Sequence, residues 1–133
     1  MAFLLDSNTV IYFFKNAGQV RNHMRQHEDQ DFKLCTPVLW ELLTGANKAR
    51  DSSAQHARLA LFQSRFELLP FDQEAARHAA QVRAQLEAQG TPIGAVDTMI
   101  AGVALAHEHV LVTRNVREFE RVQGLQIQNW FEA

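Results

Sequence analysis

The strongest constraint on the fold is a set of four short apolar runs in which polar residues do not alternate with apolar ones. The runs are residues 3–5, 32–35, 66–69 and 110–113. This pattern is typical of strands that are buried on both faces of a sheet. Stretches with helix-forming patterns follow the runs, at residues 9–15, 18–28, 37–47, 53–64, 73–89, 95–108 and 116–121. The alternation predicts an α/β fold in three layers, with a mainly parallel sheet between helices.

A fifth short run, residues 125–128, is interpreted as a last strand. Trp130 and Phe131 follow it and either pack on the domain or face a partner. A chain of 133 residues, 47% of them hydrophobic, is long enough for one ordinary core, so residues 1–133 are expected to form a single domain.

Capping residues mark several helix boundaries. Thr36 is expected to cap a helix that has Pro37 at its first position, and Asp72 is expected to cap the helix over residues 73–89. Residues 89–92 read as a helix stop followed by a turn.

Composition excludes several classes of protein. The single cysteine, Cys35, cannot form an intramolecular disulfide, and no Cys/His spacing indicates structural zinc. The first residues lack the pattern of a signal peptide, and no apolar run approaches the roughly 18 residues of a membrane helix. We therefore expect a soluble cytoplasmic protein that makes no contact with a membrane. The net charge of -2 argues mildly against a nucleic-acid partner, but three acids committed to cations would remove that objection.

Two carboxylates occupy positions that favour function. Asp6 ends the first strand, and ligands of open parallel sheets bind beyond the carboxyl ends of the strands. The structural alternative is that Asp6 only caps the next helix. Glu41 lies in the apolar opening of the helix over residues 37–47, where an unpaired carboxylate is costly to bury. Its structural alternative is a half-exposed acid at the edge of the apolar stripe.

Asp97 has the strongest physical case of the three acids. The helix over residues 95–108 is apolar nearly all round and is therefore expected to be buried. The helix dipole stabilises an acid in the first turn by roughly 0.3–1 kcal/mol, which does not match a desolvation cost of several kcal/mol. A cation is therefore expected near Asp97, unless Asp97 is the N-cap of the helix.

Further candidates follow the fourth strand. Asn115 is expected beside Asp6, where it would orient a water molecule or ligate a metal, although Asn at this place is usually a turn residue. Arg114, Arg117 and Arg121 recur at helical spacing and would hold an RNA backbone, or else they form a solvated face together with interleaved acids.

Taken together, these residues resemble the PIN domain, and specifically the VapC toxin ribonucleases of type II toxin-antitoxin modules. The resemblance spans the whole chain in order and spacing. It rests on Leu5-Asp6-Ser7-Asn8, Glu41 with Leu42 to Ala46, Pro92-Ile93-Gly94 before Asp97 and Ile100-Ala101, and Val112-Thr113 with Asn115 and Phe119. Ser7 stands where Thr is common, and Asn115 replaces an Asp, which removes one anionic ligand.

The resemblance implies a five-stranded parallel sheet and a catalytic set of Asp6, Glu41, Asp97 and Asn115. It implies Mg²⁺ or Mn²⁺ as cofactor, with Asp6 and Asp97 as its principal ligands, in keeping with a site made only of oxygen ligands. Ser7, Thr113, Arg114 and Arg117 are expected to contact substrate. The activity would be cleavage of structured RNA such as tRNA, which inhibits translation. A VapB-like antitoxin would neutralise it, and homodimers and toxin-antitoxin hetero-oligomers are expected.

Two other interpretations remain open at this point. Asp6-Ser7-Asn8-Thr9-Val10 after an apolar strand imitates the opening motif of haloacid-dehalogenase-type phosphatases, but Asn8 stands where that family needs a second acid. A non-catalytic module of the same fold is the other alternative, although such a protein would usually have lost one of the three acids.

Overall fold

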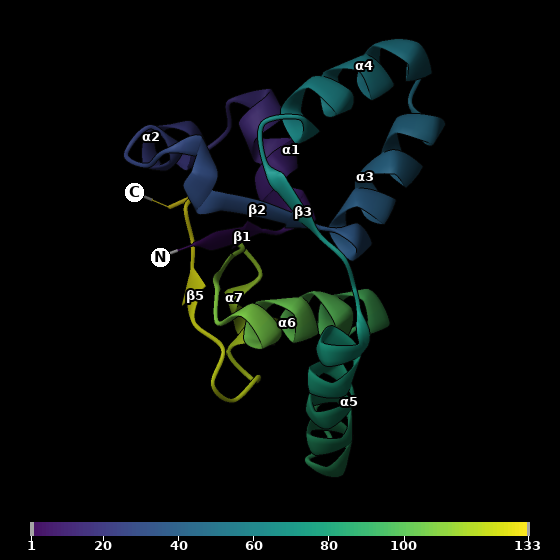
Figure 1. The fold of residues 1–133 in the computed structure, drawn as a ribbon, viewed down its shortest axis with the longest axis vertical. Helices are drawn as coiled ribbons and strands as arrows, with labels where there is room; N and C mark the ends of the chain where they lie inside the picture. The colour runs from purple at the N-terminus through teal and green to yellow at the C-terminus, as the bar shows by residue number, and fades with distance from the viewer. Residues whose placement is uncertain (1, 133) are drawn as a thin grey trace.

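The computed structural model describes residues 2–132 and confirms the three-layer α/β fold (Figure 1). Over this part of the chain the sheet has five strands in the order β3-β2-β1-β4-β5, and every neighbouring pair is parallel. The strands are β1 (Phe3–Leu5), β2 (Phe32–Cys35), β3 (Glu67–Leu69), β4 (Val110–Val112) and β5 (Ile127–Gln128).

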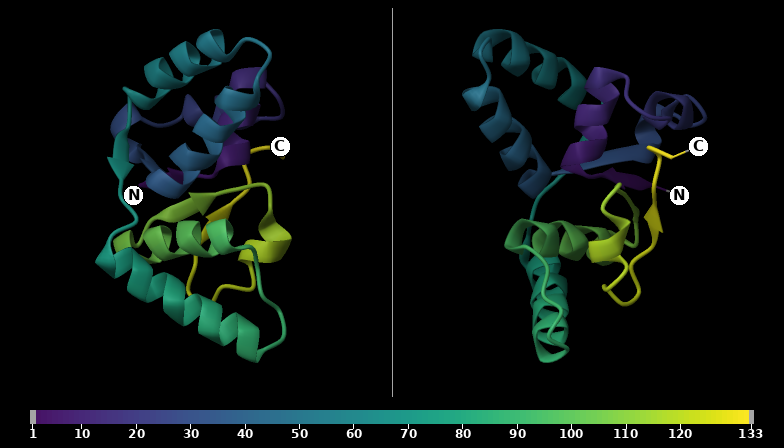
Figure 2. Two further views of the ribbon diagram at one scale, coloured as in Figure 1. Left: turned by 90° about the vertical axis from the view of Figure 1, so that its right-hand side faces the viewer. Right: turned by 180° about the vertical axis from the view of Figure 1, so that it is seen from behind.

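Helices cover both faces of this sheet (Figures 1 and 2). One layer holds α1 to α4, and the opposite layer holds α5 and α6. The helices are α1 (Ser7–Lys15), α2 (Val20–Met24), α3 (Thr36–Lys48), α4 (Ser52–Gln63), α5 (Gln73–Ala88), α6 (Ala95–His107) and α7 (Val116–Phe119), with a 3-10 turn η1 (Asp29–Asp31). Within residues 2–132, none of the helices combines the length and the apolar character that crossing a membrane requires.

The central strands explain why the apolar runs do not alternate. Every residue of β1 and β4 is buried, because helices pack on both faces of these strands. In contrast, α3 and α4 form an arm that projects from the sheet (Figure 1) and carries three large apolar side chains that are exposed. They are Trp40, Leu43 and Leu61.

Several predicted boundaries are wrong for identifiable reasons. The helix expected over residues 18–28 is reduced to the five residues of α2, because only Val20 and Met24 of this polar segment reach the core. The last helix ends at Phe119, and the last strand covers only residues 127–128. Cys35, not Thr36, is the N-cap of α3, since the Thr36 hydroxyl accepts a hydrogen bond from the Phe71 N–H (3.0 Å).

Other boundaries are confirmed. Asp72 caps α5 by accepting a hydrogen bond from the Ala75 N–H (3.0 Å). Pro37 is confirmed in the first turn of α3, as its second residue and not its first, and its missing N–H leaves no intrahelical bond unmade there.

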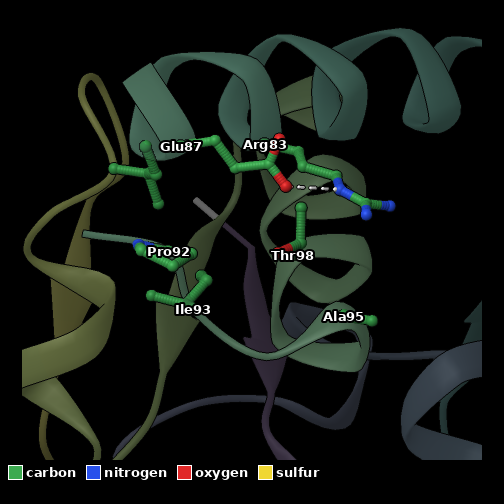
Figure 3. Close-up of a pocket in the computed structure, with 7 residues that line it drawn as sticks. Arg83, Glu87, Pro92, Ile93, Ala95 and Thr98 are labelled. Carbon is green, nitrogen blue, oxygen red and sulfur yellow. Dashed lines mark hydrogen bonds and ion pairs between the residues drawn. The ribbon is translucent and has the colours of Figure 1, made fainter. Parts of the chain in front are cut away.

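The pair of helices α5 and α6 is packed closely enough to require glycine at residue 102. A Cβ atom at Gly102 would lie 2.5 Å from the Ala75 carbonyl oxygen and 2.7 Å from the Ala79 Cβ. Towards the other end of the pair, Arg83 and Glu87 form an ion pair (3.1 Å) over a small pocket of about 100 Å³ that Thr98 also lines (Figure 3). This packing fixes α6, the helix that carries Asp97.

We expect Gly102→Ala to lower the free energy of unfolding by about 2 kcal/mol, because the new methyl group must displace the backbone of α5. Urea unfolding measures the change. Gly45→Ala in α3 is the matched control, since no atom lies within 4 Å of its Cβ position. There the higher helix propensity of alanine should raise stability by up to about 1 kcal/mol. Equal effects of the two substitutions would contradict the close approach of α5 and α6.

Candidate active site

Four acidic side chains lie near enough to one another, at the carboxyl edge of the sheet, to affect one another's ionisation. Asp6 follows β1, Glu41 comes from α3, Asp97 from the first turn of α6, and Glu118 from α7. Their mutual influence is electrostatic: the charges of Glu41 and Glu118 raise the pKa of Asp6, and the charges of Asp6, Glu118 and Glu41 raise that of Asp97. The structure thus brings together the three acids that the sequence singles out.

Asp6 is the best anchored of these acids. It is 5% exposed, and its Oδ1 accepts a hydrogen bond from the Ser7 N–H (2.8 Å) at the N-terminus of α1. Its Oδ2 accepts a second one from the Thr113 hydroxyl (2.8 Å), which itself accepts from the Asn115 N–H (3.0 Å). Burial raises the pKa of Asp6, while the bonds from Thr113 and Ser7 oppose that rise. The capping role of Asp6 is therefore confirmed. The additional bond from Thr113 also ties Asp6 to the end of β4.

Ser7 links Asp6 to the second acid. Its hydroxyl donates a hydrogen bond to Oε1 of Glu41, which is half-buried on α3. One serine therefore orients two carboxylates, the first through its backbone and the second through its side chain. The hydroxyl is the group that Ser7 shares with the more common threonine at this position.

Asp97 does not cap its helix. The N-cap of α6 is Gly94, so Asp97 lies at the third helical position and the capping alternative is wrong. Burial is the largest effect on Asp97, followed by its hydrogen bond with Glu118 and by the three neighbouring negative charges. Together they raise the pKa of Asp97 to about 7.

Glu118 is a member of the site that the sequence interpretation missed. In the sequence it counts only among the acids interleaved with the arginines, in the alternative that this segment is a solvated face. In the structure Glu118 is half-buried, accepts a hydrogen bond from the Asn115 side-chain amide and contacts Asp97. The available signal was its position three residues after Asn115 on a helix that begins at the carboxyl end of a strand. Asn115 stands where the resemblance expects an aspartate, and Glu118 supplies a carboxylate beside the Asn115 amide.

The arginines do not form one face. Arg121 lies beyond the end of α7 and donates to the Pro92 carbonyl oxygen (3.3 Å). Arg117 is exposed. Arg114 is exposed too, but its guanidinium lies 3.6 Å from the centre of the Phe131 ring. The helical spacing expected to bring Arg114, Arg117 and Arg121 together is therefore not realised, because α7 covers only residues 116–119.

None of the four acids is paired with a cationic side chain in the part of the chain that the structure describes, and Asp97 is hydrogen-bonded to another of the acids, Glu118. Hydroxyl, backbone N–H and amide groups donate to Asp6, Glu41 and Glu118. Two unit charges 4 Å apart repel by about 4 kcal/mol at an effective dielectric constant of 20. The site therefore concentrates negative charge that the protein itself does not neutralise.

This chemistry fits a hard divalent cation. Carboxylate oxygens and the Asn115 amide oxygen are ligands that Mg²⁺ and Mn²⁺ accept, and thiolate or imidazole groups are not part of the set. Among residues 2–132, no three acidic, His or Cys side chains are already close enough to hold an ion as they stand. The donor types and the uncompensated charge fit the metal, and the carboxylates would have to draw together around it.

We expect Asp97→Asn to stabilise the metal-free protein in EDTA by about 1–2 kcal/mol above pH 7, a figure discounted because Asp97 is only partly buried. The raised pKa means that the folded state holds the Asp97 proton more tightly than the unfolded state does. Wild-type stability should therefore fall as pH rises from about 4 to 7, and the gain from the substitution should vanish below pH 4. Urea unfolding at several pH values tests this. Glu120→Gln, at an exposed neighbouring acid, should change little.

Comparison with known proteins agrees with this geometry. The PIN domain family model matches residues 3–125. The tRNA(fMet)-specific endonuclease VapC of Salmonella typhimurium is 40% identical over 133 residues, and Ribonuclease VapC2 of Rickettsia felis is 30% identical over 132, each alignment covering 98% of both chains. A crystal structure of DNA-bound VapBC from Salmonella typhimurium matches with a TM-score of 0.91 and 39% identity over 98% of both chains. The chain therefore belongs to the PIN domain family, and within that family to the VapC proteins.

Proposed function

We propose that this protein is a divalent-metal-dependent endoribonuclease that cleaves a tRNA and thereby inhibits translation. The observation that carries the proposal is the group of four acids that no cationic side chain of residues 2–132 pairs with. Burial, the hydrogen bond with Glu118 and the neighbouring negative charges together raise the pKa of Asp97 in this group to about 7. The names of the Salmonella and Rickettsia relatives supply the reaction class and the type of RNA. Because tRNA is a cytoplasmic molecule, the proposed activity takes place in the cytoplasm. The proposal treats residues 1–133 as a single domain.

In this proposal Asp6 and Asp97 are the principal ligands of Mg²⁺ or Mn²⁺, with Glu118 completing the anionic set. When bound, the cation supplies a Lewis acid that neutralises the charge developing on the phosphodiester. Glu41, held by Ser7 through Oε1, has its other oxygen available to orient the attacking water and accept its proton. Asn115 holds Glu118 in place and offers a neutral oxygen to the site.

The substrate contacts follow from the same geometry. Ser7 and Thr113, expected to contact substrate, are buried and position the carboxylates instead. Arg114 and Arg117 remain as the proposed substrate contacts, because they lie exposed on the segment that leads from β4 into α7. Arginine at such positions binds the phosphates of an RNA backbone.

A VapB-like antitoxin is the proposed partner, as the VapBC composition of the similar crystal structure suggests. A groove of about 470 Å³ between α1, α3 and α4 is lined by Ile11, Phe14 and Leu59 and reaches Glu41. The side chain of Trp40 is 57% exposed on α3. A chain docked along this groove would reach the acids and block RNA, and the exposed apolar residues of the α3–α4 arm also suit a homodimer contact.

The phosphatase alternative is wrong, since the chain belongs to the PIN family and Asn8 is an exposed residue of α1. A non-catalytic module of the same fold is the outcome that the cleavage assay below would reveal.

Purified protein with Mg²⁺ or Mn²⁺ is expected to cleave tRNA(fMet), and excess EDTA should abolish cleavage. Asp6→Asn and Asp97→Asn should each lower kcat/KM by at least about 10³-fold, because each removes a metal ligand. Gel analysis of end-labelled tRNA provides the measurement. Cleavage that persists in both variants, or a wild-type protein that cuts no RNA in a panel of structured RNAs, would contradict the proposal.

Glu118→Gln is expected to weaken Mn²⁺ binding about tenfold and to lower the pKa of Asp97, because one negative charge and one contact to Asp97 are lost. Isothermal titration with Mn²⁺ measures the first effect, and NMR of the Asp97 carboxyl carbon measures the second. Glu120→Gln, two residues away and exposed, is the matched control. If both variants bind Mn²⁺ as the wild type does, Glu118 does not belong to the metal site.

A further inference from the structure

The most unusual cation of the molecule is Arg114, which lies one residue after Thr113 and one before Asn115. Both neighbours are fixed at the acidic site by hydrogen bonds, Thr113 to Asp6 and Asn115 to Glu118. The Asn115 N–H also donates to the Thr113 hydroxyl, which holds the backbone of Arg114 in a tight turn. The base of the Arg114 side chain is therefore as well ordered as the site itself.

Aromatic rings, not acids, hold the head of Arg114. Its guanidinium lies 3.6 Å from the centre of the Phe131 ring and 5.6 Å from that of Tyr12, and it donates a long hydrogen bond to the Tyr12 hydroxyl (3.4 Å). Within residues 2–132 it forms one ion pair, to Glu132, which is long at 3.9 Å, lies between exposed side chains and therefore contributes little. Stacking fixes the plane of a guanidinium but leaves its N–H edges available to another anion.

Phe131 is itself fixed in place by the turn between α1 and α2. Its carbonyl oxygen accepts a hydrogen bond from the Gln19 N–H (3.0 Å), and its ring meets the Tyr12 ring edge-on at 4.8 Å. Gly18 has a φ of 60°, and a Cβ atom there would lie 2.6 Å from the Phe131 ring. Figures 1 and 2 show this C-terminal segment beside α2. The fit depends on glycine and gives the ring one defined position.

The location of this arrangement suits a nuclease. Tyr12 lies six residues after Asp6 on α1, which corresponds to about 9 Å along the helix axis. The Arg114 guanidinium contacts Tyr12 and not the four acids, so it is placed to bind a phosphate that neighbours the scissile one on the same strand.

We propose that Phe131, together with Tyr12, is a positioning residue that holds Arg114 in the orientation that binds a backbone phosphate next to the cleaved one. The inference rests on the proposed nuclease function and adds the C-terminal segment to its substrate-binding machinery. The competing explanation is that Arg114 merely fastens this segment to the domain, in which case the stack serves stability alone.

Steady-state cleavage of tRNA(fMet) separates the two explanations. Arg114→Ala should raise KM about tenfold with kcat within about twofold, as expected for a lost phosphate contact. Phe131→Leu keeps apolar packing against Gly18 but removes the ring face, and it should raise KM about three- to fivefold. Phe131→Tyr keeps the ring face and should therefore have the KM of the wild-type protein. In the Arg114→Ala background, Phe131→Leu should have no further effect on KM.

Binding gives a readout that a purely structural role would not change. Anisotropy of labelled tRNA(fMet) with the cleavage-deficient Asp97→Asn protein, over a range of KCl concentrations, reports the number of phosphate contacts. Arg114→Ala should reduce the slope of log Kd against log salt by about 0.7–1. Arg83→Ala is the matched control, because Arg83 is an exposed cation on α5 that pairs with Glu87 (Figure 3), and the slope should not change.

Additive effects of Phe131→Leu and Arg114→Ala on KM would overturn the inference. A lower unfolding midpoint of Phe131→Leu with unchanged KM would overturn it as well and support the fastening role. Either result leaves the nuclease function intact, since the wild-type protein cleaves in both cases. A wild-type protein that neither cleaves nor binds tRNA(fMet) would instead remove the proposed function and this inference together.

Discussion

The buried hydrogen bond between the Thr113 hydroxyl and Asp6 is the interaction on which the site depends. It joins residues that are 107 positions apart in the sequence and ties the ends of the two central strands together. Through Ser7, the same corner extends to Glu41, and through the Asn115 N–H it extends to the segment that carries Glu118. A change at either end of this bond would disturb the positions of all the acids, even though only one of them would lose a direct partner.

The kind of donor that the fold uses here has a functional meaning. A lysine or arginine beside Asp6 would anchor it more strongly than a hydroxyl does, but it would also neutralise the charge. Neutral donors orient the carboxylates and leave their charge in place, at the expense of stability in the metal-free state. The protein thus keeps electrostatic strain in the one region where a divalent cation would relieve it.

The sequence alone was sufficient for the fold class, because unbroken apolar runs and intervening helical patterns are local signals of a buried parallel sheet. It also singles out Asp6 and Asp97 by their positions and Glu41 mainly by the family resemblance, and the structure places the three acids near one another. It failed where tertiary contacts decide. The helix at residues 18–28 is short because only one of its turns meets the core. Glu118 is distinguished from Glu120 only by the direction in which a short helix faces. The stacking of Arg114 on Phe131 joins residues that no local pattern connects.

The order of the strands also determines the stage of translation at which the sheet and the acidic site can form. β1 is made first, but it lies between β2 and β4, so its pairing remains incomplete until residues 110–112 have left the ribosome. At about 5–20 residues per second, the interval between Asp6 and Thr113 is about 5–20 seconds. During that time the nascent chain carries Asp6 and Glu41 without the strand and helix that complete their surroundings. On the proposed function, the nascent chain would therefore be unable to cleave the tRNA on which its own translation depends until its synthesis is almost finished.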